Sequence, residues 1–218
     1  LTPLTLGADY PPSDEKKNSV GPLVVVYGDS HAQHLIPGLT LLQNERTFRL
    51  KKIGWEECAP VSDVKASDAE NCRRLQIATE EDFVRLKPDI VVIGAFWYQY
   101  NHIERLTKTL QFFQSIGVPR IVVVGTVPFW PEPPQSLLYK AMRANPLHRI
   151  PERLSVFYPE TFKADKEIEM ITKNLGVTFI STRNIFCNED GCLVRSGDSA
   201  KIYFRSTLPI SARLVPRI

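Results

Sequence analysis

A glycine, a carboxylate, a hydroxyl and an imidazole follow one another in the stretch VVVYGDSHAQH, residues 24–34. A serine such as Ser30 attacks acyl carbonyls when a neighbouring general base takes its proton. Asp29 and Ser30 are also good helix N-caps, because their side-chain oxygens accept hydrogen bonds from the free N–H groups of a first helical turn. The stretch by itself therefore leaves two interpretations open for Ser30, a nucleophile and a helix cap.

The flanking residues predict that this polar cluster lies between a strand and a helix. The apolar run at residues 23–27 indicates a buried strand, and Leu35, Leu39 and Leu42 recur at helical spacing. Turns of this kind lie at the carboxyl edge of an open α/β sheet, where such proteins bind their ligands. The position of the cluster therefore suits a functional site.

Strands and helices alternate along the rest of the chain. Apolar periodicity and turn residues predict further strands at 47–54, 89–97, 120–128 and 177–180, and helices at 73–86, 102–117 and 165–176. Residues 135–160 are ambiguous, and we expect them to form a broken helix over the site. The alternation predicts an α/β fold with a parallel sheet and helices on both faces.

The length and composition fit one globular domain. The 218 residues are 43% hydrophobic and 23% charged, which is ordinary for an α/β domain. Residues 1–22 contain proline, glycine and serine, and we expect an N-terminal extension or linker there before a domain at 23–218. The net charge of +3 comes from scattered residues, which argues against a nucleic-acid surface. No run approaches the roughly 18 apolar residues that a membrane-spanning helix needs.

The four cysteines fall into two local pairs. Cys187 and Cys192 flank the turn-forming residues NEDG, and Cys58 and Cys72 flank a polar stretch. Two local disulfides are the simplest interpretation, and they imply an oxidising compartment such as the bacterial periplasm. Zinc binding and four reduced cysteines remain as alternatives, although neither pair has the close spacing or the nearby histidine typical of a zinc site.

Four blocks of sequence occur in order between residues 23 and 194, namely GDSHAQHLIPGL, GWEECAP, PDIVVIGAFW and FCNEDGCLV. Together they resemble the SGNH hydrolase superfamily, whose members are also called GDSL-like esterases. The resemblance is greatest to the soluble domain fused to membrane acyltransferases that O-acetylate bacterial surface polysaccharides. It implies a three-layer α/β/α, flavodoxin-like fold with a mainly parallel five-stranded sheet.

The same resemblance assigns roles to single residues. It implies that Ser30 is the nucleophile and that the N–H groups of Ser30 and Gly54 stabilise the oxyanion formed during attack. Trp97 stands where the membrane-fused branch usually has a tryptophan in place of the superfamily's asparagine, and we expect it to line the pocket or to lie in the core. We expect His31 to line the pocket and Asp29 to hold the turn as a structural carboxylate.

The histidine base of this family is missing from its expected place. The resemblance implies a C-terminal Asp-x-x-His motif, whereas the tail KIYFRSTLPISARLVPRI, residues 201–218, has neither an acid nor a histidine. Three explanations are open: an inactive relative that binds glycans, a base supplied by His102 or His148, and residues missing from the sequence. We favour the third, which predicts a break in the chain within residues 204–213. We expect His34 on the surface of the helix.

The resemblance and the cysteine pairs together predict an O-acyltransferase domain on the periplasmic face of the bacterial inner membrane or outside the cell. Ser30 would accept an acyl group, with acetyl the expected one, and pass it to a glycan hydroxyl such as one of lipopolysaccharide O-antigen. The acetyl donor, ultimately acetyl-CoA, would arrive through a membrane acyltransferase domain in the same or a partner chain. The alternatives are a carbohydrate acetyl esterase and an inactive glycan-binding domain. We expect no bound metal or organic cofactor.

Overall fold

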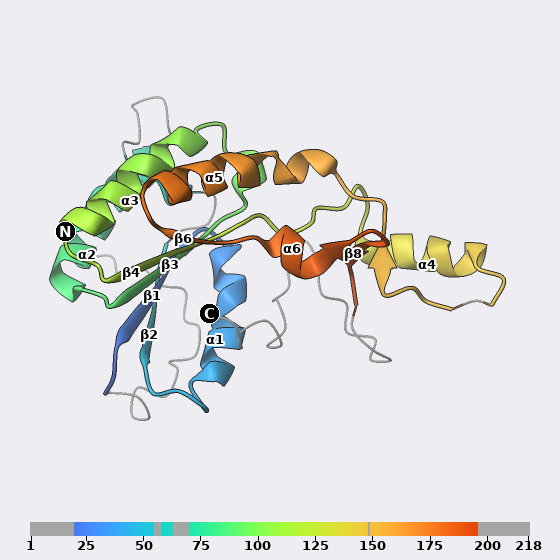
Figure 1. Cartoon of the computed structure of the whole chain (residues 1–218), viewed down its shortest axis with the longest axis horizontal. Helices are drawn as coiled ribbons and strands as arrows, with labels where there is room; N and C mark the ends of the chain where they lie inside the picture. The colour runs from blue at the N-terminus through green and yellow to red at the C-terminus, as the bar shows by residue number, and fades with distance from the viewer. Residues whose placement is uncertain (1–19, 55–57, 63–69, 148, 196–218) are drawn as a thin grey trace.

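The computed structural model describes residues 20–54, 58–62, 70–147 and 149–195, and Figure 1 shows the chain from blue to red. The larger sheet consists of strands β1 (Leu23–Gly28), β2 (Arg49–Ile53), β3 (Ile90–Gly94), β4 (Arg120–Val124) and β6 (Thr178–Ile180). The helices are α1 (Ile36–Leu42), α2 (Glu70–Leu86), α3 (Leu106–Ser115), α4 (Pro134–Ala144), α5 (Lys163–Asn174) and α6 (Thr182–Phe186). Short 3₁₀ helices are η1 (Ala32–Leu35), η2 (Trp97–Gln99), η3 (Ile103–Arg105) and η4 (Pro159–Phe162).

The larger sheet has the strand order β2-β1-β3-β4-β6, and every neighbouring pair in it is parallel. The predicted α/β class is therefore confirmed. Numbered along the chain within this sheet, the order is that of flavodoxin-like folds, because β5 belongs to another sheet. In this order the chain reverses its direction of growth between β1 and β3, and the loops at the carboxyl ends of these two strands diverge to leave a crevice.

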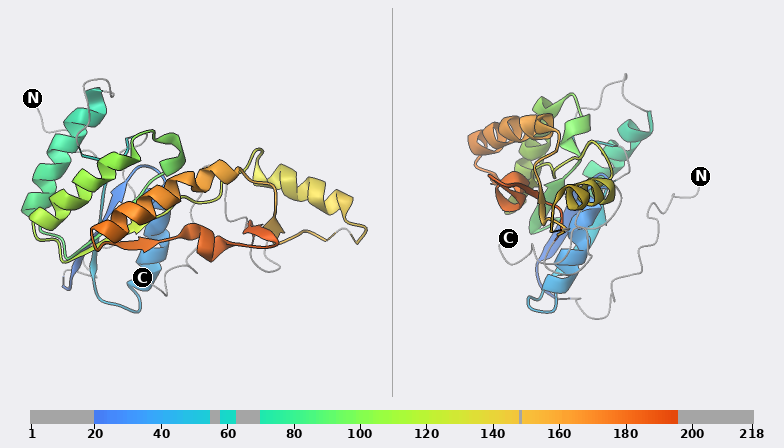
Figure 2. Two further views of the ribbon diagram at one scale, coloured as in Figure 1. Left: turned by 45° about the horizontal axis from the view of Figure 1, so that its top comes forward. Right: turned by 90° about the vertical axis from the view of Figure 1, so that its right-hand side faces the viewer.

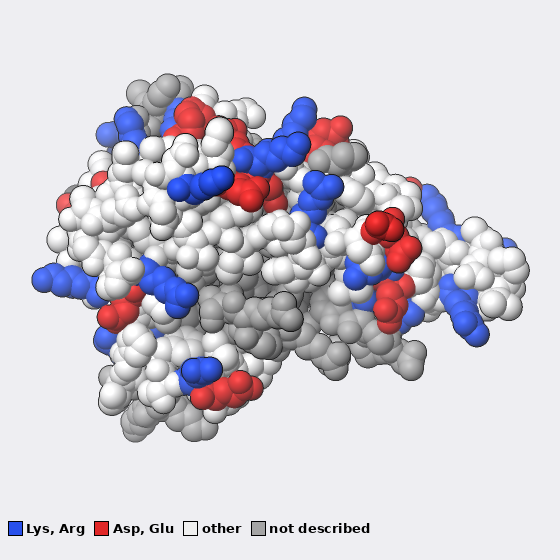
Figure 3. Space-filling model, in the orientation of Figure 1, with Lys and Arg blue, Asp and Glu red and all other residues white. Residues whose placement is uncertain are grey.

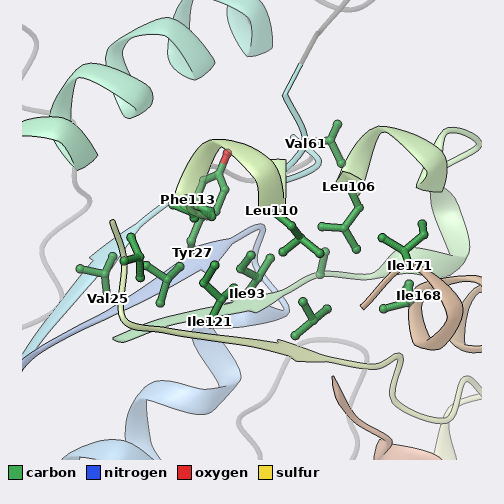
Figure 4. Packing of buried hydrophobic residues seen from close by; sticks show 14 of the residues in the cluster. Val25, Tyr27, Val61, Ile93, Leu106, Leu110, Phe113, Ile121, Ile168 and Ile171 are labelled. Carbon is green, nitrogen blue, oxygen red and sulfur yellow. The ribbon is translucent and has the colours of Figure 1, made fainter. Parts of the chain in front are cut away.

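Helices cover both faces of the sheet. Successive residues of a strand point to opposite faces, so Val25 and Tyr27 lie on one face of β1 and Val24 and Val26 on the other. The first face packs against α2, α3 and α5, with Tyr27 lying close to Phe113 in a cluster that Figure 4 shows. The second face packs against η1 and α1. Figure 1 shows this layering, with α3 and α5 above the sheet and α1 below it.

A second, three-stranded antiparallel sheet was not predicted from the sequence. It has the order β5-β8-β7, with β5 at Arg153–Leu154, β7 at Cys187–Asn188 and β8 at Gly191–Leu193. Strands of two or three residues are too short to produce a recognisable alternation of apolar and polar residues.

Both predicted disulfides are present. Cys187 lies directly opposite Cys192 in the hairpin of β7 and β8, and a disulfide joins them. A second disulfide joins Cys58, which follows β2, to Cys72 in α2. The structure therefore contains neither the reduced cysteines nor the zinc ligands that we kept as alternatives.

The ambiguous segment at 135–160 does not form one broken helix over the site, contrary to our expectation. Helix α4 begins at Pro134 and ends at Ala144, and the chain then continues through β5 to η4. Figures 1 and 2 show that α4 extends away from the larger sheet. Proline at the first helical position fixes where this helix begins, because proline cannot be accommodated later without loss of a hydrogen bond.

Three sequence-based points concern other parts of the chain. The boundary between the extension at 1–22 and the domain at 23–218 stays a prediction, because residues 1–19 lie outside the described residues. The predicted chain break within 204–213 also lies outside them. Within the described ranges, the structure holds no helix with the length and apolar character needed to cross a membrane.

Candidate active site

Asp29 joins the turn after β1 to the loop after β3. Its carboxylate is 1% exposed, and Oδ1 accepts a hydrogen bond from the backbone N–H of His31 at 2.8 Å. Oδ2 accepts one from the backbone N–H of Phe96 at 2.9 Å and one from the hydroxyl of Tyr100 at 2.8 Å. A carboxylate suits this position because it has two oxygens that only accept. The side chain therefore holds together the two loops that flank the crevice.

Ser30 lies in the same turn but takes no part in shaping it. The residue is half-buried, and its hydroxyl makes no hydrogen bond with another described residue. The following 3₁₀ helix has His31 at its N-cap position, and it is Asp29 that accepts from the N–H of His31. No capping bond in the described part of the chain involves the hydroxyl of Ser30. Its role as a nucleophile stays a prediction.

The backbone of Gly54 lies close to the end of β1, just before the turn that contains Ser30. Gly54 directly follows β2 and has a φ of +143°. A Cβ atom at this position would lie 1.8 Å from the carbonyl oxygen of Gly28, which no side chain tolerates. Gly28 itself has a φ of +152°, and a Cβ there would lie 1.7 Å from the oxygen of Gly94. Glycine at both positions lets the ends of β1, β2 and β3 come together beside Ser30.

A cavity of about 410 Å³ opens beside this turn. His31 and His34 line one part of it, and Phe96 contributes from the loop after β3. The remaining walls come mainly from the loop after β4 and the start of α4, namely Gln99, Val127, Pro128, Phe129, Trp130, Pro131, Glu132, Pro133 and Pro134. The cavity is thus largely apolar and aromatic, with a few polar groups, which is typical of a ligand site.

His31 and His34 lie together in the cavity wall. The ring of His31 stacks on Phe96, with centroids 4.5 Å apart and planes 8° apart, and its centroid is 5.3 Å from that of His34. The position of His34 differs from the expected helix surface because the first turn is a 3₁₀ helix. In such a helix residues three apart lie on the same side.

Both rings are neutral at neutral pH. Burial lowers the pKa of His31, although the charge of Asp29 opposes this shift. Burial and the neighbouring His31 lower the pKa of His34 to about 4. Neutral imidazoles add hydrogen-bonding capacity to the cavity without adding charge, and Nδ1 of His31 is buried with no partner among the described residues.

Trp97 lies in the core and not in the cavity wall. The side chain is fully buried, and its indole N–H donates to the backbone oxygen of Val124 at 2.8 Å. It belongs to the same apolar cluster as Tyr27 and Phe113. Its neighbour Phe96 faces the cavity instead. A strand end places successive side chains on opposite sides, and the sequence did not show which of the two faces inward.

Of the two alternative bases, only His102 lies among the described residues, and it is not hydrogen-bonded to Ser30. His102 is half-exposed at the surface, where its Nδ1 lies 3.2 Å from Oε1 of Glu104. His148 and the tail at 196–218 lie outside the described residues. Within the described ranges, no histidine is hydrogen-bonded to Ser30, and no group of three or more His, Cys, Asp or Glu side chains is arranged to hold a metal ion.

Helix α5 places a buried carboxylate, which the sequence analysis did not single out, against the loop after β4. Asp165 of α5 is 7% exposed, and its Oδ1 accepts from the backbone N–H of Thr126 at 2.8 Å. Its Oδ2 is buried and has no hydrogen-bond partner among the described residues. Burial raises the pKa of Asp165 from 3.8 to about 6, although the hydrogen bonds with Thr126 and the charge of Arg183 oppose the shift. Sequence periodicity gave no sign of this carboxylate.

We expect Asp165 to destabilise the fold as the pH rises. Because its folded-state pKa is raised, its contribution to stability is present below about pH 4 and is lost as the pH rises through about 6. Between pH 4 and 7 the free energy of unfolding of the native chain should fall by roughly 2 kcal/mol more than that of Asp165→Asn. Urea unfolding across this range tests the difference. Asp190→Asn, at an exposed turn, should follow the native profile; parallel profiles for Asp165→Asn would contradict the prediction.

Charged side chains do not gather over the visible face of the molecule. Acidic and basic residues are interspersed on the face that Figure 3 shows. An electrostatic footprint for nucleic acid is a single basic patch or stripe, and this face has none.

Comparison with known proteins agrees with this geometry. The periplasmic domain of the lipopolysaccharide acetyltransferase of Salmonella ser. Paratyphi A has a similar structure, with a TM-score of 0.71 and 18% sequence identity. The similarity covers 84% of this chain and 74% of that chain, and it shows that the fold is shared. No curated protein matches the chain in sequence.

A family model described as the SGNH domain fused to AT3 domains matches residues 6–205, which is most of the chain. The match includes the turn with Ser30, the cavity loops and both disulfides, and it ends before residues 206–218. The resemblance found in the sequence blocks is therefore confirmed. The chain belongs to the family of SGNH domains that are found fused to AT3 domains.

Proposed function

We propose that this domain transfers an acyl group, with acetyl the expected one, to a hydroxyl of a bacterial surface glycan through Ser30. The observation that carries the proposal is that Asp29 and Ser30, two neighbours in one turn, differ in their hydrogen bonding. Asp29 accepts three hydrogen bonds that shape the turn, whereas the hydroxyl of Ser30 makes none with a described residue. The family's fusion to AT3 domains and the lipopolysaccharide acetyltransferase of similar fold support a glycan acceptor.

The reaction proceeds in two acyl transfers. The oxygen of Ser30 attacks the acyl carbonyl of the donor while its proton passes to a base, and the donor's leaving group departs with a proton. The N–H groups of Ser30 and Gly54 stabilise the negative oxygen that forms, because both lie at the carboxyl edge beside the crevice. A glycan hydroxyl then attacks the acyl-serine, gives up its proton to the same base and releases Ser30.

The described residues supply no base for Ser30, and no histidine follows His148 in the sequence. The family's Asp-x-x-His motif would belong to residues missing from the sequence, which is the explanation we favour. The acyl donor, ultimately acetyl-CoA, would be supplied by a membrane acyltransferase domain in the same or a partner chain. This arrangement corresponds to the periplasmic face of the bacterial inner membrane, where the disulfides would also persist.

Covalent labelling tests the nucleophile. A fluorophosphonate forms a phosphorus–oxygen bond to an activated serine as fluoride leaves, so we expect one adduct, on the peptide that contains Ser30. Peptide mapping by mass spectrometry locates it. Heat-unfolded protein serves as the control, because labelling that survives unfolding does not report an active site. An adduct-free Ser30 under conditions that label a known serine esterase would support the inactive, glycan-binding alternative.

Product analysis separates acyl transfer from hydrolysis. With an acetyl ester as donor and a de-O-acetylated surface polysaccharide as acceptor, we expect acetate esters on the glycan in addition to free acetate. An esterase uses the same nucleophile but lets water attack the acyl-serine, so it would give only free acetate with or without the glycan.

A further inference from the structure

Aromatic rings from three separate loops form a continuous stack beside the cavity. Phe129, in the loop after β4, lies at the centre. Its ring centroid is 5.3 Å from that of Phe96, 6.0 Å from that of Tyr98 and 5.6 Å from that of Tyr158. The planes of Tyr98 and Tyr158 lie 29° and 21° from the plane of Phe129, so each of these two rings stacks on Phe129.

Backbone hydrogen bonds hold the loops that carry these rings. The N–H of Tyr158 donates to the carbonyl oxygen of Phe129 at 2.9 Å, which joins the segment before η4 to the loop after β4. The N–H of Phe96 donates to Asp29, which joins the loop after β3 to the turn with Ser30. The stack is therefore fixed relative to that turn before any ligand binds.

The outer rings of the stack remain open to solvent. Tyr98 is 40% exposed and Tyr158 is 39% exposed, whereas Phe96 and Phe129 are partly covered and line the cavity. Large aromatic side chains that stay exposed while stacked in a fixed arrangement indicate a recognition surface more than a folding core. The surface is continuous with the cavity, whose wall also includes His31, the residue after Ser30.

The chemistry of this surface fits a sugar ring. The C–H groups on the face of a pyranose are weakly positive, and they pack against the negative face of an aromatic ring. Polar groups at the cavity, among them the exposed Gln99 and the carboxylate of Glu132, can hydrogen-bond sugar hydroxyls at the edge of such a stack. Glu132 is already paired with Lys140 at 2.6 Å, so the local charge is balanced, as suits an uncharged ligand.

We infer that Tyr98, Phe129 and Tyr158 form a stacking platform that binds a pyranose unit of the acceptor glycan next to Ser30. The inference rests on the proposed function only in taking the glycan as the acceptor. The aromatic rings of the platform pack against the flat faces of the sugar rings and so hold the glycan chain. This packing orients one sugar hydroxyl toward the turn with Ser30, and it needs no ion pair to a charged sugar.

A binding titration on the whole chain tests the platform without any acyl transfer. Cellotetraose is the probe, because its equatorial hydroxyls leave both faces of each ring to C–H groups; sorbitol, an open-chain polyol, is the ligand control. Changes in ligand NMR signals report binding. Replacing both exposed tyrosines in Tyr98→Ala/Tyr158→Ala should weaken cellotetraose binding about tenfold, from the loss of two ring contacts. Tyr98→Phe/Tyr158→Phe keeps the rings and should bind like the native chain.

Tyr139→Ala is the matched control, because Tyr139 is 60% exposed on α4 and stacks on no other ring among the described residues. It should bind cellotetraose like the native chain. Equal binding by Tyr98→Ala/Tyr158→Ala and the native chain would overturn the inference, and so would an equal loss in the Tyr139→Ala control. Failure of the native chain to bind cellotetraose, or binding of indole in its place, would also overturn it and indicate an apolar partner.

The outcomes separate this inference from the proposed function. Ring-dependent binding together with an unlabelled Ser30 would keep the platform and reject the acyltransferase. A labelled Ser30 together with binding that does not depend on the rings would do the reverse. Circular dichroism of each variant shows whether a loss of binding reflects a loss of folding.

Discussion

Replacing Ser30 with alanine is expected to lower the rate of acyl transfer by about 10⁴-fold, because no other group can form the acyl intermediate once the nucleophile is gone. Stability should change by less than about 0.5 kcal/mol, since the hydroxyl makes no hydrogen bond with a described residue. Release of p-nitrophenol from p-nitrophenyl acetate measures the first acyl transfer, and urea unfolding measures the stability.

The matched control for this prediction is Ser115→Ala. Ser115 ends α3, and its hydroxyl donates to the backbone oxygen of Phe112. It lies near the start of β4 and thus at the opposite edge of the sheet from Ser30. This variant should keep the native rate. A Ser30→Ala protein with the native rate would reject the nucleophile. A native chain with neither ester cleavage nor labelling would support the inactive-relative alternative.

Replacing Asp29 with alanine should have the largest effect on stability, a loss of about 4 kcal/mol in the free energy of unfolding. The backbone N–H groups of His31 and Phe96 and the hydroxyl of Tyr100 would all lose the acceptor they now share. A buried donor without an acceptor costs about 1–3 kcal/mol, because it has lost its hydrogen bonds to water and gained none in the protein. The two loops around the crevice would separate, so activity should fall with stability. Urea unfolding measures the change.

Two other substitutions provide the comparison for the loss of stability expected of Asp29→Ala. Asp29→Asn keeps one accepting oxygen but turns an N–H₂ group toward donors, so its loss should be smaller than that of Asp29→Ala. Asp82→Ala removes an acid on α2 that pairs only at the surface with Arg85, and it should change stability by less than about 1 kcal/mol. If Asp29→Ala were no more destabilising than Asp82→Ala, the role of Asp29 as a structural carboxylate would be refuted.

The larger sheet was predictable from the sequence because its central strands must be apolar along their whole length. β1, β3 and β4 are covered on both faces, so each must be apolar throughout, and continuous runs such as VVVY and IVVI satisfy this. The outer strand β2 carries Lys51 and Lys52, which are exposed, and was predicted from its alternation of residue types and its glycine end. The small sheet was missed, because a hairpin of two paired positions leaves no period to detect.

The candidate site was predictable only where it is local in sequence. The turn at Asp29 and Ser30 followed from one strand and the residues after it. His34 was misplaced because helical spacing was assumed for a turn that is a 3₁₀ helix. The rings of Phe96, Phe129 and Tyr158 meet only because parallel strands bring their loops to one edge of the sheet. The spacing of residues along the chain does not show which loops come together in this way.

The glycines at the ends of β1 and β2 restrict how this domain can diverge. Gly28 and Gly54 leave no space for a Cβ atom, so any larger residue at either position would strain the protein. Under the proposed function, these two positions could not change to suit a new acceptor. A change of acceptor would instead draw on the loops after β3 and β4, where side chains are large and line the cavity. The edge of the sheet beside Ser30 would then stay constant while the outer loops diverge.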